Sequence, residues 1–123
     1  MTNKPSLRIA AIAATAAISF AAAINASLAL LAGDTLVVPD ELGPAQIILF
    51  TVVMIVPAAL VLWALPRWFP TIVLAVAVLT LPFPFMEFGT PIALWLGAMH
   101  LITGGCAAVL APRIAARGAP TAP

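Results

Sequence analysis

The chain contains one histidine, His100, and this residue lies in the middle of an apolar run where an ionisable side chain is costly. Small residues recur around it at intervals of three and four, which places them with His100 on one face of a helix. They are Ala93, Gly97, Gly104, Ala108 and Ala111. Small residues mark faces on which helices approach closely in lipid, so His100 is predicted to point into a helix bundle.

Other polar side chains lie at comparable depth in the neighbouring apolar runs. Counted from the outer end of each run, His100 is about 15 Å deep, Asn25 about 12 Å, and Thr51 and Thr80 about 10 Å each. The four side chains can form a polar layer, with Glu87 as the only charge in the segment outside it. All five residues are candidates for binding a ligand, and His100 is the only candidate for catalysis.

Two interpretations of this layer stay open. Asn25 and His100 can be interhelical hydrogen-bonding groups that only specify helix packing, each bond contributing about 0.6 to 2 kcal/mol. Alternatively, the layer lines a small polar pocket that opens outward. His100 can serve as a general acid or base there, but the sequence shows no second catalytic group.

Several other chemistries are disfavoured by composition. His100 and the single cysteine, Cys106, have no carboxylate at spanning depth, so they lack the usual number of metal ligands. One cysteine also allows no internal disulfide. A net charge of +1 provides no basic stripe for nucleic acid. We therefore expect no metal, no cofactor and no nucleic-acid partner.

The elements that position these residues are predicted to be membrane-spanning helices. With 64% apolar and 7% charged residues and a mean hydropathy of +1.21, the chain lacks the polar surface of a soluble globule. Four apolar runs each approach the roughly 20 residues needed to cross a bilayer. They cover about 9–32, 44–65, 70–85 and 91–111. This pattern predicts an all-α bundle of four transmembrane helices, a single domain over 1–123 with a short flexible inner tail at 112–123.

The charged residues alternate in sign between these runs. All five basic residues fall on one face of the membrane and all four acidic residues on the other; they are Lys4, Arg8, Arg67, Arg113 and Arg117, and Asp34, Asp40, Glu41 and Glu87. Since basic loops are retained inside, both termini are predicted to be cytoplasmic. The first run also resembles a signal peptide, and cleavage would leave three spans. Its length exceeds the about 7 to 15 residues of a signal-peptide core, which favours an uncleaved helix.

Prolines interrupt two of the predicted helices. Pro57 lies inside the second run, where it predicts a kink. Pro82 and Pro84 bias the backbone out of the α region and predict that the third helix breaks near its outer end. The aromatic segment that follows, 81–91, is then either an interfacial loop or a lid that carries Glu87.

Three short segments resemble a known family. The runs Asp34-Thr35-Leu36-Val37-Val38-Pro39, Pro57-Ala58-Ala59-Leu60 with Trp63, and Met99-His100-Leu101 are similar to small four-span actinobacterial integral membrane proteins of unknown function. The resemblance covers most of the chain. It implies the four-helix architecture and a bacterial inner-membrane location, singles out His100, and brings no assigned activity.

Three classes of function follow from these observations. An accessory or scaffold protein, which associates with itself or with a larger membrane partner, is favoured because no chemistry is evident. A binder or carrier would hold a small or lipid-like ligand in an outward-facing pocket around His100. A membrane enzyme would act on an apolar substrate with His100 as acid or base.

Overall fold

The computed structural model describes residues 4–35 and 42–118, and within these ranges it contains helices and no strands. The helices are α1 (Leu7–Thr35), α2 (Pro44–Val52), α3 (Ile55–Ala64), α4 (Phe69–Thr80), α5 (Phe83–Glu87) and α6 (Thr90–Gly118). They form four segments long and apolar enough to cross a membrane: Leu7–Asp34, Pro44–Ala64, Phe69–Glu87 and Thr90–Gly118. The predicted all-helical class and the four long apolar segments are confirmed for the described residues.

The outer surface of the bundle is apolar. Large side chains such as Leu79 and Met86 are 75% and 77% exposed, as expected of a surface that contacts lipid rather than water. The architecture is therefore compatible with a small membrane protein.

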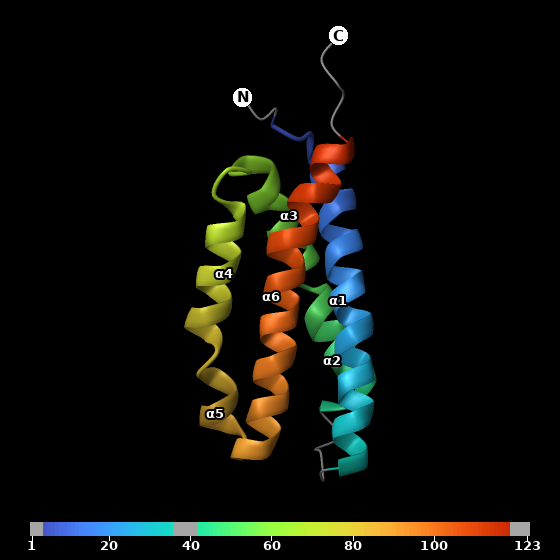
Figure 1. Cartoon of the computed structure of the whole chain (residues 1–123), viewed down its shortest axis with the longest axis vertical. Helices are drawn as coiled ribbons and strands as arrows, with labels where there is room; N and C mark the ends of the chain where they lie inside the picture. The colour runs from blue at the N-terminus through green and yellow to red at the C-terminus, as the bar shows by residue number, and fades with distance from the viewer. Residues whose placement is uncertain (1–3, 36–41, 119–123) are drawn as a thin grey trace.

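In the bundle, α6 has α1 along one side and α4 along the other, with α2 and α3 behind them (Figure 1). The start of α1, the α3–α4 hairpin and the end of α6 lie at one end of the bundle. The end of α1, α5 and the start of α6 lie at the other. The described charges are sorted accordingly, with the basic residues at the first end and Asp34 and Glu87 at the second. Asp40 and Glu41 lie outside the described residues.

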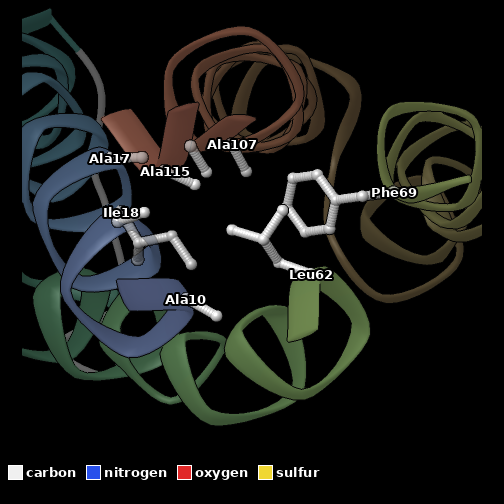
Figure 2. Close-up of a cluster of buried hydrophobic side chains, with 9 residues drawn as sticks. Ala10, Ala17, Ile18, Leu62, Phe69, Ala107 and Ala115 are labelled. Carbon is white, nitrogen blue, oxygen red and sulfur yellow. The ribbon is translucent and has the colours of Figure 1, made fainter. Parts of the chain in front are cut away.

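The α1–α6 interface is built from alanines. On α1 the side chains of Ala10, Ala13 and Ala17 are fully buried, and they meet Ala107 and Ala111 of α6 in one apolar cluster. A methyl side chain lets two helix backbones approach closely, which is the main source of helix association in lipid. Larger side chains fill the space where the other helices meet this pair; Figure 2 shows Ile18, Leu62 and Phe69 pointing toward one another.

Glycine allows a similar close approach between α4 and α6. A Cβ added at Gly104 would lie 2.8 Å from the Cβ of Ala77, well inside a normal contact. A Cβ added at the adjacent Gly105 would meet nothing within 4 Å. Gly104 therefore sets the distance between α4 and α6, one turn away from His100.

The second span is interrupted one turn before Pro57. Helix α2 ends at Val52, α3 begins at Ile55, and the Met54 N–H donates to the Thr51 carbonyl at 3.2 Å instead of continuing the α-helical pattern. Pro57 has no N–H for the Val53 carbonyl, and its ring crowds that group. In the third span, α4 ends at Thr80 and α5 begins at Phe83, so the aromatic segment is partly helical.

The end of the chain differs from the sequence prediction. Residues 112–118, predicted as part of a flexible tail, continue α6 through Pro112. Ala115 is buried in the apolar cluster, and Gly118 lies beside Ile9 of α1. Packing against the start of α1 therefore stabilises the helix beyond the proline. Residues 119–123 lie outside the described residues.

Candidate functional site

A partly open cavity of about 730 Å³ lies between the helices and is lined by all four spans. It forms because α4 packs chiefly against α6, whereas α2 and α3 pack chiefly against α1. Most of its wall is aliphatic. The polar lining residues are Asn25, Thr51, Glu87, His100 and Thr103.

Asn25 connects three helices at the wall of this cavity. Its amide nitrogen Nδ2 donates to Thr51 Oγ1 of α2 at 3.3 Å and to Thr103 Oγ1 of α6 at 2.8 Å. The side chain is only 2% exposed. Asn25 is thus a buried interhelical bridge as well as a lining residue.

The two threonines fix the orientation of the Asn25 amide. Thr51 donates its hydroxyl proton to the Ile47 carbonyl at 2.8 Å, and Thr103 donates its own to the Met99 carbonyl at 2.9 Å. A hydroxyl has one proton, so both threonines can only accept from Asn25. The nitrogen side of the amide must therefore face them.

This orientation leaves the Asn25 carbonyl oxygen without a donor. Oδ1 is buried and has no hydrogen-bond partner, and it is the only such buried side-chain atom in the described part of the chain. A buried acceptor that is left unsatisfied costs about 1 to 3 kcal/mol. Such a group in a native structure calls for an explanation beyond helix packing.

His100 makes a separate connection between α4 and α6. Its Nε2 is hydrogen-bonded to Thr80 Oγ1. The Thr80 hydroxyl also lies 2.7 Å from the Val76 carbonyl, to which it can donate its proton, and the direction of its bond with Nε2 depends on the His100 tautomer.

The predicted polar layer is therefore divided into two groups. Asn25 and Thr51 are brought together with Thr103, while Thr80 pairs with His100; no hydrogen bond among the described residues joins the two groups. Thr80 is not itself a lining residue.

Two further residues complete the comparison with the sequence prediction. Glu87 lines the cavity from α5 and is exposed, as the only charged lining residue. Thr103 was missed by the sequence argument, although its position three residues after His100 places both on neighbouring parts of one helix face.

Among the residues with described positions, no three His, Cys, Asp or Glu side chains could hold a metal, and Cys106 is a half-buried free thiol.

Comparison with protein-family models, curated proteins and solved structures finds no match to this chain. The family resemblance stays a prediction, and the site has to be interpreted from its geometry.

That geometry can hold an apolar molecule. The cavity lies within the roughly 300 to 1,000 Å³ of ligand sites, and it combines apolar walls with a few fixed polar groups. His100 has one ring nitrogen committed to Thr80, and a second catalytic side chain beside it is not evident among the described contacts.

Proposed function

We propose that this protein binds a small or lipid-like apolar molecule in the cavity between its four spans. The observation that carries the proposal is the cavity of about 730 Å³ itself. In lipid, helix association depends on close packing, and the α1–α6 interface provides that packing. A bundle that served only as a scaffold would gain stability by closing the cavity in the same way.

In this proposal the protein crosses the membrane four times, with both termini in the cytoplasm. This orientation is supported by the collection of the basic residues at one end of the bundle. The proline-containing turn and α5 then lie at the outer end, where Pro84, Glu87 and Phe88 line the cavity. In this proposal α1 is a permanent span, since its alanine face forms the core and Asn25 belongs to the site.

Two valines on α4 provide a matched test. Val76 lines the cavity, whereas Val78 does not and is 60% exposed on the outer surface. We expect Val76→Trp to narrow the cavity and Val78→Trp to leave it unchanged. Native mass spectrometry of gently extracted protein should then show a bound non-protein mass on the wild type and on Val78→Trp, and less of it on Val76→Trp.

Two results would contradict the proposal. Equal retention of the bound mass by both variants would place the molecule outside the cavity. Wild-type protein that carries no bound mass, and acquires none from added membrane-lipid extract, would favour a scaffold.

A further inference from the structure

We infer that the molecule held in the cavity is a neutral apolar alcohol, with its hydroxyl group donated to Asn25. This inference rests on the proposed ligand-binding function and specifies the ligand by the hydrogen bonds that the wall can still make.

The side-chain donors of Asn25, Thr51 and Thr103 in the cavity wall are already used. Both Asn25 Nδ2 protons are directed at threonine hydroxyls, and the Thr51 and Thr103 protons are donated to helix carbonyls. His100 Nε2 is hydrogen-bonded to Thr80. A ligand that could only accept hydrogen bonds would therefore find no free side-chain donor at Asn25, Thr51 or Thr103.

Acceptors, in contrast, remain available. Asn25 Oδ1 has no donor, and Glu87 is the only acidic lining residue. Oδ1 itself is buried, so the inferred contact requires the wall to move before a ligand donor can reach it. Satisfying this oxygen removes the penalty that it carries in the packed bundle.

The charges around the cavity favour a neutral ligand. None of the lining residues, all of which lie in the described ranges, is a lysine or arginine, and the five basic residues lie at the end of the bundle opposite Glu87. An anionic head group would thus have no basic partner in the cavity wall. A buried ammonium beside the neutral Asn25 amide would also be poorly compensated. A hydroxyl group donates without either cost.

The test compares four competitors of the same chain length on wild-type protein in lipid nanodiscs. The probe is hexadecanol with a diazirine in its chain, which labels the protein on illumination. Its labelling is competed with hexadecanol, the methyl ether of hexadecanol, hexadecane or hexadecylamine. We expect label on lining residues, with hexadecanol competing about twofold to tenfold better than the ether, since one neutral hydrogen bond separates them.

The outcomes distinguish the inference from the function on which it rests. Equal competition by the alcohol, the ether and the alkane overturns the alcohol preference but leaves an apolar site. Stronger competition by the amine overturns it in favour of a cation held at Glu87. Label that no competitor reduces overturns both.

A pair of variants tests whether Asn25 is the acceptor that causes the preference for the alcohol over the ether. Asn25→Leu should abolish the difference between alcohol and ether, whereas Ser27→Ala, on the exposed face of the same helix, should retain it. Unchanged alcohol preference in a folded Asn25→Leu protein would exclude Asn25 as the acceptor. If that variant does not fold, the competition on wild-type protein decides alone.

Discussion

The two sides of α6 are packed in different ways. Toward α1, small side chains interlock and the alanines are buried completely. Toward the space between α4 and α2, the same helix faces a cavity of about 730 Å³ with Asn25, His100 and Thr103 in its wall. In a solvent where contact area drives association, a packed face stabilises and an open face does not. The difference supports the proposal that the open side is kept for a ligand.

Overfilling the packed side should produce the largest effect. Ala17 is fully buried between α1 and α6, and the preceding Ala16 is exposed. We expect Ala17→Phe to destabilise the bundle by about 3 kcal/mol or to prevent its assembly, because the helices would have to separate. Ala16→Phe should be nearly neutral. Thermal unfolding in detergent measures both, and similar stabilities would contradict the packed interface.

Separating α4 from α6 should have a smaller effect. Gly104→Ala places a methyl group 2.8 Å from Ala77 Cβ, so we expect a loss of about 1 to 2 kcal/mol and a weaker His100–Thr80 contact. Gly105→Ala meets open space and should match the wild type or slightly exceed it. The same unfolding assay applies, and a more harmful Gly105→Ala would show that the helix faces are assigned wrongly.

Removing the polar bridge should have the smallest effect on stability. Asn25→Leu loses two interhelical hydrogen bonds, but both threonines keep their carbonyl partners and the unsatisfied oxygen disappears. These changes offset each other, so the free energy of unfolding should change by less than about 1 kcal/mol. A loss of several kcal/mol would instead show that Asn25 serves mainly to hold the helices together.

The sequence predicted the features that depend on one helix at a time. Apolar run length located the four long apolar helical segments, and the small-residue spacing pointed His100 toward the bundle, where it is hydrogen-bonded to Thr80 of α4. Both depend on distance along a helix axis, which residue counting provides.

Features that depend on the rotation of helices relative to one another could not be predicted from the sequence. Depth placed Asn25, Thr51, Thr80 and His100 at similar levels but did not say which side chains face each other. The rotation of α2 depends on the interruption at Val53, and the distance between α4 and α6 depends on Gly104. Both are properties of the packed bundle rather than of a single helix. The two separate polar groups, the role of Thr103 and the cavity emerge only there.

The most direct test of a ligand-binding cavity is an experimental structure of the wild-type protein in nanodiscs prepared with native lipid. We expect elongated density between α4 and α2, ending within hydrogen-bonding distance of Asn25 Oδ1. A bundle in which α4 closes against α2 and α3, with Oδ1 bonded to a protein donor, would contradict the account.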